Sequence, residues 1–293
     1  VRPVSEPTLK AVPLGPDIVA TVPATVLSSY YNAGALPDPN FDDNLSMNSE
    51  SFFNRDFLYK RTFQVPSKMK GKRILLNFDG INWKALVVLN GKQVGRIEGA
   101  FMRGQFDITD YLQEGDNELL VYVQNNDNPG ARKTKTGENT SFNGGVLGGD
   151  NPTFHATIGW DWITTIPGRE VGIWNDVFLT ATEAVTISDP LVNTTLADGK
   201  ATMTPSVFVK NHLSTPVHGT LRGNIGDICF EKEVILGANT ETEIVFSPEE
   251  YRQLAGQHMK LWWPNGYGKP HMYHAAYTFH SPQTKSVARM EYR

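Results

Sequence analysis

The sequence has little cysteine, no long apolar run and little net charge. Cys229 is the single cysteine in 293 residues, which excludes an internal disulfide and any zinc site built from cysteines. Apolar runs such as Ala85 to Leu89 fall far short of the roughly 20 residues that span a bilayer, so we expect no membrane partner. The 27 basic and 31 acidic side chains leave a formal charge of -4, which is too balanced for electrostatic binding of nucleic acid.

Short runs rich in Val, Ile, Phe, Tyr and Thr, separated by 26 Gly and 18 Pro, dominate the sequence. This pattern is typical of all-β sandwiches. Ile74, Leu76 and Phe78 alternate, and a later apolar run enters Asn90-Gly91, a strong signal for a two-residue hairpin. We therefore expect antiparallel strands, the clearest of them at 85–89, 93–97, 105–108, 118–124 and 172–180.

Only two short helices are expected. The first, at 24–33, has apolar residues at helical spacing and ends at Gly34, a good C-terminal cap residue. The second begins at Ser247, which can cap the helix, continues with Pro248 at a favourable first position and ends at Gly256.

A glycine-rich stretch without periodicity, residues 125–153, is followed by a restart of the strand pattern near Glu183. Long loops without secondary structure in compact domains are usually functional or mobile. We place the domain boundary at the restart, so that residues 1–183 form one domain and residues 184–293 a second. The second, with its seven or so short strands, has the size of an immunoglobulin-like β-sandwich without cysteines.

Several kinds of chemistry find no support in the sequence. The glycines of 144–149 lack the Lys-Ser/Thr and the helix start of a phosphate cradle, and no Gly-x-Ser-x-Gly elbow occurs. His271 and His274 would share a face only on a helix, so packing or exposure is favoured over metal binding. Asn117-Glu118 superficially resembles a glycosidase acid/base dipeptide, but it opens a strand after a turn, where a solvated carboxylate is ordinary. We expect no cofactor, no metal and no catalytic residue.

The most informative segment is Gly159-Trp160-Asp161-Trp162. On an extended backbone the two indoles project to one face and Asp161 alone projects to the other. One interpretation is structural: Asp161 forms an ion pair with Arg169 while the tryptophans fill the core. The other is functional: Asp161 accepts hydrogen bonds from two neighbouring sugar hydroxyls, and nearby aromatic rings cover the C–H faces of the pyranose. The residues alone leave both interpretations open.

With further blocks in the same order, this segment gives nearly the whole chain a resemblance to the N-terminal part of glycoside hydrolase family two, especially its β-mannosidase and exo-β-glucosaminidase branches. The other matching blocks are Val22-Pro23-Ala24-Thr25-Val26-Leu27, Leu36-Pro37-Asp38-Pro39, Phe78-Asp79-Gly80-Ile81, Val88-Leu89-Asn90-Gly91 and Phe106-Asp107-Ile108-Thr109. The resemblance implies a jelly-roll β-sandwich of the galactose-binding-like type, then an immunoglobulin-like β-sandwich, then a (β/α)8 barrel with both catalytic glutamates. We find no counterpart of the barrel in these residues.

The resemblance also implies roles for individual residues. In the two branches named, the Asp that matches Asp161 reaches from the jelly roll into the barrel pocket and helps to hold the terminal sugar. Trp160 and Trp162 match as supports, either in the core or as a pocket wall. Asn126 resembles a residue on the rim of the pocket. These residues are the expected substrate-binding set.

Two further blocks bear on the comparison. After Trp162 the mannosidase pattern has Gly-Pro, whereas Ile163-Thr164 stands here, and Pro167-Gly168-Arg169 is closer to the glucosaminidase side. The identity of the sugar therefore stays open. Leu261 to Gly268 resembles a block of the second domain, which we interpret as a structural strand and turn rather than a sugar contact.

The favoured hypothesis is the non-catalytic front portion of an exo-acting retaining β-glycosidase. Its partners would be a β-linked oligosaccharide or glycoside and its own C-terminal catalytic barrel. Alone it should not hydrolyse glycosides, because the covalent mechanism needs two positioned carboxylates. The alternatives are a stand-alone carbohydrate-binding module and a scaffold that only braces a partner. A periplasmic or secreted location is expected; Val1 to Leu9 shows no signal peptide, which maturation would have removed.

Overall fold

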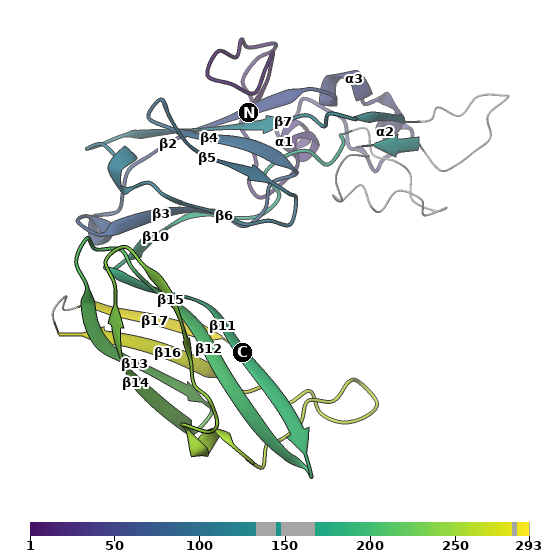
Figure 1. Ribbon diagram of the computed structural model, residues 1–293. Helices are drawn as coiled ribbons and strands as arrows, with labels where there is room; N and C mark the ends of the chain where they lie inside the picture. Colours follow the sequence, from purple (N-terminus) through teal and green to yellow (C-terminus); the bar gives the residue numbers. More distant parts are fainter. Residues whose placement is uncertain (133–144, 148–167, 283–285, 293) are drawn as a thin grey trace. The chain divides into compact units, whose positions relative to one another are not determined.

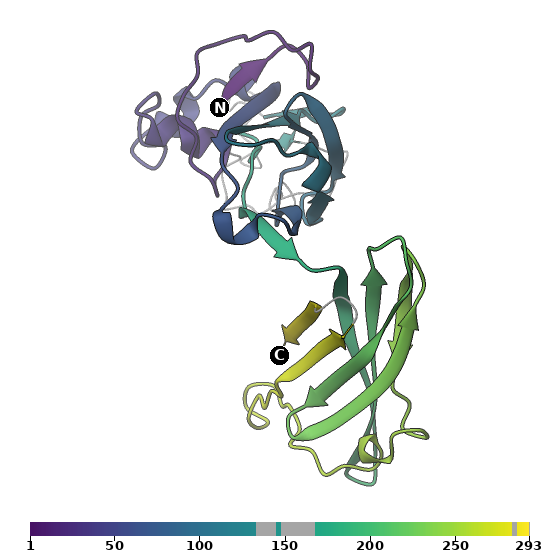
Figure 2. The same cartoon turned by 90° about the vertical axis from the view of Figure 1, so that its left-hand side faces the viewer.

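The computed structural model describes residues 1–132, 145–147, 168–282 and 286–292 (Figure 1; Figure 2). The chain divides into two compact units, Val1–Ala181 and Thr182–Arg293. Each unit is built from antiparallel sheets with few and short helices, so the prediction of an all-β fold with two sandwiches is confirmed. Among the described residues, no helix has the length and apolar character needed to cross a membrane.

The first unit packs a five-stranded sheet against a three-stranded one. The larger sheet has the order β1 (Arg2–Val4), β2 (Asp56–Phe63), β7 (Asn117–Gln124), β4 (Lys84–Leu89) and β5 (Lys92–Glu98). The smaller sheet has the order β10 (Val177–Thr182), β3 (Arg73–Phe78) and β6 (Gly104–Asp107).

Alternation along β7 shows why the larger sheet forms. Leu119, Val121 and Val123 point into the core between the sheets, whereas Tyr122 faces the opposite side. That opposite side has a smaller apolar cluster of its own, in which Tyr122 packs with Val4 of β1. The middle of the sheet is therefore buried on both faces, which explains why β4 is a continuous apolar run rather than an alternating one.

The turn between β4 and β5 is the predicted hairpin. Asn90 and Gly91 have φ values of 50° and 74°, which match the left-handed pair that a type I′ turn requires. The Asn90 side chain donates to the carbonyl of Tyr111 and to Oδ1 of Asn117, at 2.8 Å each, and accepts from the amide of Glu118 at 2.9 Å. The turn is thus tied to the start of β7.

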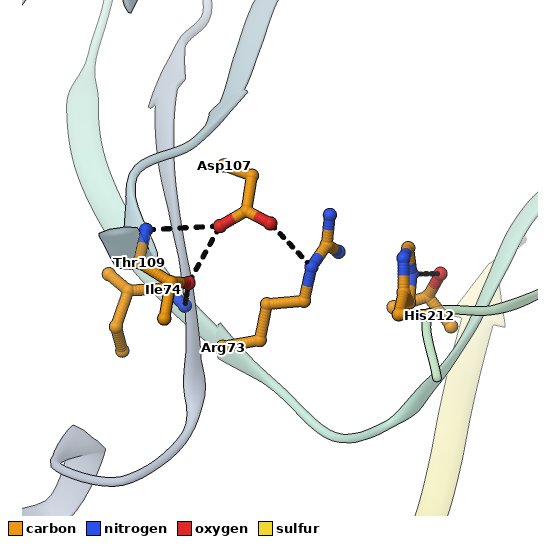
Figure 3. Close-up of polar contacts among 6 residues, drawn as sticks. Arg73, Ile74, Asp107, Thr109 and His212 are labelled. Carbon is orange, nitrogen blue, oxygen red and sulfur yellow. Dashed lines mark hydrogen bonds and ion pairs between the residues drawn. The ribbon is translucent and has the colours of Figure 1, made fainter. Parts of the chain in front are cut away.

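The block Phe106 to Thr109 has a structural role (Figure 3). Asp107 accepts hydrogen bonds from the amide of Thr109 at 3.0 Å and from its hydroxyl at 2.6 Å. Arg73 donates to the other carboxylate oxygen at 2.8 Å, and the Thr109 hydroxyl accepts from the amide of Ile74 at 2.9 Å. Although burial would raise it, these hydrogen bonds and the Arg73 charge hold the pKa of Asp107 below its usual range. The end of β6 is thereby fastened to the start of β3.

The helix expected at 24–33 is present as α1 (Val26–Asn32). Thr25 caps it by accepting from the amide of Ser28 at 3.1 Å, and Gly34, with φ of 72°, follows its end. The remaining helices are short: α2 (Asn44–Met47), α3 (Glu50–Phe53) and 3₁₀ turns at Ser67–Met69, Thr109–Tyr111 and Arg252–Leu254.

The second unit is also a sandwich. One sheet has the order β11 (Val185–Ala197), β12 (Lys200–Asn211) and β15 (Glu241–Val245); the other has β14 (Ile228–Leu236), β13 (Val217–Ile225), β16 (Ala275–Ser281) and β17 (Ser286–Tyr292). Gly219 and Gly223 lie on the inward face of β13 because a Cβ there would meet the rings of Phe279 and Phe230 at 2.4 and 2.2 Å. Aromatic packing across the core therefore decides where this strand has glycine.

Three local predictions are wrong or incomplete. The second helix does not form: Ser247 caps only a turn, accepting from the amide of Glu250 at 3.3 Å, before a single 3₁₀ turn. The strand expected at 172–180 begins only at Val177, because Gly172 instead bridges to Asn82. The glycine-rich stretch contains one short ladder, β8 (Gly130–Arg132) with β9 (Gly145–Leu147); residues 133–144 and 148–153 lie outside the described residues.

Candidate functional site

Polar and aromatic side chains gather at one end of the first sandwich. There β4 begins at Lys84, opposite Gln124 at the end of β7 and Glu98 at the end of β5. The start of β2 and the bridge between Asn82 and Gly172 lie at the same end. We call this end, formed by residues 48–56, 79–84, 98–104, 124–130 and 168–176, the loop end.

Asn126, a predicted substrate-binding residue, lies at the loop end. The residue before it is held twice: the amide of Asn125 donates to Asp56 Oδ1 and its side chain donates to Asn54 Oδ1, at 2.7 Å each. Burial raises the pKa of Asp56, and the hydrogen bond from Asn125 opposes that shift. Asn126 follows directly and is half-buried. The backbone that presents its amide is therefore fixed.

Next to Asn126, an indole, an ammonium group and a carboxylate adjoin one another. Lys84 Nζ lies 4.3 Å from the ring centroid of Trp83 and 2.7 Å from Oδ2 of Asp127. Trp83 is almost wholly buried, and its Nε1 has no hydrogen-bond partner among the described residues. The carboxylate of Asp127 is largely exposed. The exposed part of this cluster is therefore the Asp127 carboxylate, which can accept hydrogen bonds from the hydroxyls of a ligand.

The loop between β5 and β6 adds exposed apolar surface to this end. Phe101 is 63% exposed and Met102 59% exposed. Trp174 supports them: its Nε1 donates to the carbonyl of Ala100 at 3.0 Å, and its ring meets that of Phe101 edge-on at 6.1 Å. Gly80 makes room for this indole, because a Cβ there would lie 2.4 Å from Trp174 Cε2.

A buried ion pair lies at the loop end. Arg169, 4% exposed, donates from Nη2 to Oε1 of Glu50 at 2.7 Å and from Nη1 to the carbonyl of Pro129. Burial lowers the pKa of the guanidinium, and the negative charge of Glu50 opposes this. Arg169 therefore joins the backbone before β8 to α3.

The residue after Arg169 is constrained as well. Both Arg169 and Glu170 have φ near +50°, at 56° and 49°, a region that side chains with Cβ rarely adopt. The side chain of Asn82 donates to the carbonyl of Glu170 at 2.9 Å and holds this conformation. Burial raises the pKa of the Glu170 carboxyl, whose Oε2 has no hydrogen-bond partner among the described residues.

Three of the four predicted substrate-binding residues, Trp160, Asp161 and Trp162, lie outside the described residues. Only Asn126 of that set can be placed. The structural alternative paired Asp161 with Arg169; within the described part, the guanidinium binds Glu50 and Pro129.

The dipeptide Asn117-Glu118 has a structural environment. Asn117 is fully buried, and its Oδ1 accepts from the amide of Gln113 at 2.9 Å, which closes the turn before β7. Glu118 forms an exposed ion pair with Lys60. Each side chain thus has a local partner that accounts for its presence.

The two histidines are not brought together as ligands. His271 meets the ring of Tyr273 edge-on at 4.9 Å, and His274 Nε2 lies 3.9 Å from Oε2 of Glu291. Across the part of the chain that the structure describes, no group of three or more His, Cys, Asp or Glu side chains could hold a metal ion.

Comparison with known proteins assigns the chain to a family. The profile of "Glycosyl hydrolase 2 galactose-binding domain-like" matches residues 8–175, and that of "Glycosyl hydrolases family 2" matches residues 185–293. The chain belongs to glycosyl hydrolase family 2. The two matched segments fall within the two sandwiches.

Curated relatives in family 2 are much longer than this chain. An exo-beta-D-glucosaminidase of Streptomyces avermitilis is 26% identical over 257 residues, which are 85% of this chain and 26% of the relative. A mannosylglycoprotein endo-beta-mannosidase of Lilium longiflorum is 29% identical over 282 residues, 90% of this chain and 28% of the relative. The chain thus spans about a quarter of the length of these enzymes.

Solved family 2 structures share the fold. The exo-chitosanase CsxA of Amycolatopsis orientalis superposes with a TM-score of 0.71 at 24% identity, over 100% of this chain and 31% of that one. The beta-D-mannosidase of Dictyoglomus thermophilum gives 0.67 at 21% identity, over 98% and 34% of the two chains. At these sequence identities, the structural similarity shows only that the fold is shared.

Several residues of the loop end are not indicated by any sequence motif. Glu50 lies 119 positions before Arg169, and no local pattern links them. Trp83 and Lys84 lie two and three positions after the block Phe78 to Ile81, and Asp127 directly follows Asn126. Extending those two motifs by a few residues would have included all three.

Proposed function

We propose that this chain is the non-catalytic front portion of an exo-acting retaining β-glycosidase, and that Asp161 holds the sugar at the non-reducing end of the substrate. Membership of family 2 supports the reaction class. The chain would contribute substrate contacts, and the two carboxylates of the covalent mechanism would come from a (β/α)8 barrel.

One observation supports this assignment most directly. The segment that contains Asp161 follows β9, which pairs with β8 directly after Pro129, and the described chain resumes at Gly168. Arg169 binds the carbonyl of Pro129, so the two flanks of the segment are joined at the loop end, beside Asn126. Asp161 and Asn126 would then serve one site, although they are far apart in the sequence.

The chemistry of the side chains fits a sugar. A carboxylate only accepts hydrogen bonds, and charge-assisted bonds from two adjacent hydroxyls fix the orientation of a pyranose ring. An asparagine can donate and accept, which suits a third hydroxyl. The indoles of Trp160 and Trp162 would stack on the ring or brace the carboxylate.

The sharpest test replaces Asp161 by Asn, which keeps the shape and removes the charge. In a protein that joins this chain to its barrel, kcat/KM should fall about a hundredfold, which corresponds to the loss of a charge-assisted hydrogen bond of roughly 3 kcal/mol. Asp110→Asn, at an exposed position outside the loop end, is the matched control and should change kcat/KM by less than about threefold. An unchanged kcat/KM in Asp161→Asn would refute the role of Asp161.

The chain alone should not turn over aryl β-mannosides or aryl β-glucosaminides, and measurable hydrolysis by the pure chain would contradict the non-catalytic assignment. If Asp161→Asn instead lowers the melting temperature and leaves kcat/KM intact, Asp161 is a structural ion-pair partner.

A second candidate is a carbohydrate-binding module that acts without a barrel. The exposed ring of Phe101 and the exposed carboxylate of Asp127 favour it, because they give the loop end an apolar ring face and a hydrogen-bond acceptor within the described part of the first unit. Titration of the chain with mannose, glucosamine and β-linked oligosaccharides would distinguish the two. Millimolar or tighter binding that Asp161→Ala abolishes would favour the module.

A further inference from the structure

The second unit presents an exposed aromatic hairpin that the proposed function does not use. Every residue from Leu261 to Pro270 is exposed. Within this stretch Trp262 is 56%, Trp263 46% and Tyr267 81% exposed. We call residues 260–273 the aromatic hairpin; it precedes β16 and projects from the sandwich (Figure 1).

The aromatic hairpin is ordered by its own hydrogen bonds. The amide of Trp263 donates to the carbonyl of Lys269, and the amide of Tyr267 donates to the carbonyl of Pro264, each at 3.1 Å. At its base the amide of Lys260 donates to the hydroxyl of Tyr273 at 2.7 Å. The ring of Trp263 lies across Gly268, where a Cβ would approach it to 2.8 Å. The backbone that presents the exposed rings is therefore ordered before any ligand arrives, which lowers the entropic cost of binding.

The charge of the aromatic hairpin is of one sign. Residues 260–273 include Lys260, Lys269 and one histidine, His271, and no Asp or Glu. The whole chain, in contrast, has a net charge of -4. Sites for neutral sugars use carboxylates to accept from hydroxyls. A site with aromatic faces and ammonium donors, and without carboxylates, suits a ligand that has ring faces and anionic acceptors.

The sequence pattern predicts a structural turn at Leu261 to Gly268, but the exposure of its rings suits a ligand. We propose that the aromatic hairpin binds a β-linked oligosaccharide that bears carboxylates, as uronic acids do. Trp262, Trp263 and Tyr267 supply faces for the pyranose rings, and Lys260 and Lys269 supply the positive charge. This site is independent of Asp161 and of the loop end.

Three matched β-1,4-linked tetrasaccharides test the proposal: one of glucuronate, one of glucose and one of glucosamine. Titrations with the full 293-residue chain should give the tightest binding for the uronate, weaker binding for the neutral sugar and the weakest for the amine. High salt should remove most of the difference between the acidic and the neutral sugar. Equal affinities for all three, or no binding at millimolar concentration, would overturn the proposal.

Variants separate the contributions. Trp262→Ala and Tyr267→Ala should each weaken uronate binding about fivefold to tenfold. Lys269→Gln should weaken binding of the uronate and leave that of glucose unchanged. Ile235→Ala, at a position of β14 that is 69% exposed, is the control and should have no effect. Trp263 packs on Gly268, so Trp263→Phe is used to keep the turn folded.

Two other results would contradict the proposal. If the hairpin variants change the sedimentation of the chain and leave glycan binding intact, the aromatic hairpin is a protein contact. If Asp161→Asn abolishes the uronate binding, the ligand occupies the site of the proposed function. Loss of turnover in Asp161→Asn with uronate binding retained would support both assignments separately.

Discussion

Arg169 and Glu50 form a buried ion pair between positions that are 119 residues apart, with 2.7 Å between Nη2 and Oε1. The same guanidinium binds the carbonyl of Pro129, 40 residues away. One side chain thus joins the helix α3 to both flanks of the segment that contains Asp161. This contact explains how the long connection between Pro129 and Arg169 begins and ends at the loop end.

Removing this side chain should destabilise the first unit strongly. Arg169→Ala leaves Glu50 and the Pro129 carbonyl without the guanidinium, and we expect a loss of about 3 kcal/mol in the free energy of unfolding of that unit. Urea unfolding followed by tryptophan fluorescence measures it. Arg222→Ala in the exposed pair with Glu231 should cost less than about 1 kcal/mol. Similar losses in both variants would mean that the buried pair contributes no more to the free energy of unfolding than an exposed one.

Glu170 should make stability depend on pH. Burial raises the pKa of its carboxyl in the folded chain above the ordinary value of 4.5, so the folded state binds a proton that the unfolded state has already lost. The stabilisation is complete below pH 4.5 and is lost as the pH rises through the folded pKa. Glu170→Gln should therefore gain melting temperature relative to the parent between pH 4.5 and neutrality. Glu114→Gln, at an exposed position, should show no such trend. A difference in melting temperature between Glu170→Gln and the parent that does not change with pH would contradict this prediction.

Asp107 should have the opposite dependence on pH. Its pKa is held low by the bonds from Thr109 and Arg73, so its contribution is present above the ordinary value of 3.8 and is lost as the pH falls through the folded pKa. Asp107→Ala should cost about 1 kcal/mol at neutral pH and progressively less in acid. Thermal unfolding at several pH values measures this. Asp110→Ala, at an exposed neighbour, serves as the reference.

Gly80 should tolerate no side chain while Trp174 is in place. A Cβ at Gly80 would lie 2.4 Å from the indole, so Gly80→Ala should cost about 2 kcal/mol through overpacking. The smaller ring of Trp174→Phe should relieve the clash, and the double variant should be more stable than the sum of the single effects predicts. Denaturant unfolding of the four proteins of this cycle gives the coupling. Strict additivity would show that the two residues do not meet.

Local sequence patterns predict many strands and turns of the fold because neighbouring residues determine these elements. The alternation on β7 and the Asn90-Gly91 turn need only the immediate chain, and both form as expected. The helix at 247–256 fails although its cap residue is suitable: Ser247 caps one turn, and packing of Leu254 in the core fixes only a 3₁₀ turn behind it. A cap stabilises a helix that other forces support but does not create one.

The candidate site was less predictable, because its contacts join distant positions. The role of Asn126 is predicted through its motif and stays a prediction, whereas no motif indicates Glu50, Trp83 or Lys84. One interpretation of the sequence pairs Arg169 with Asp161, which lies outside the described residues. Within the described part, the guanidinium binds Glu50, 119 positions before it. Nothing in the residues around Glu50 distinguishes it from a solvated carboxylate at the start of a helix.

The amino-acid order by itself determined three things: that the chain forms antiparallel strands, the position of the hairpin turn, and which residues face a core. These follow from periodicity and from the φ values that glycine and asparagine tolerate. Tertiary structure alone decided which distant side chains meet: Arg169 with Glu50 and Pro129, Lys84 with Trp83 and Asp127, Trp174 over Gly80. Such contacts depend on how sheets and loops are arranged in space, and the energy of each one is realised only once the rest of the sandwich holds both partners in place.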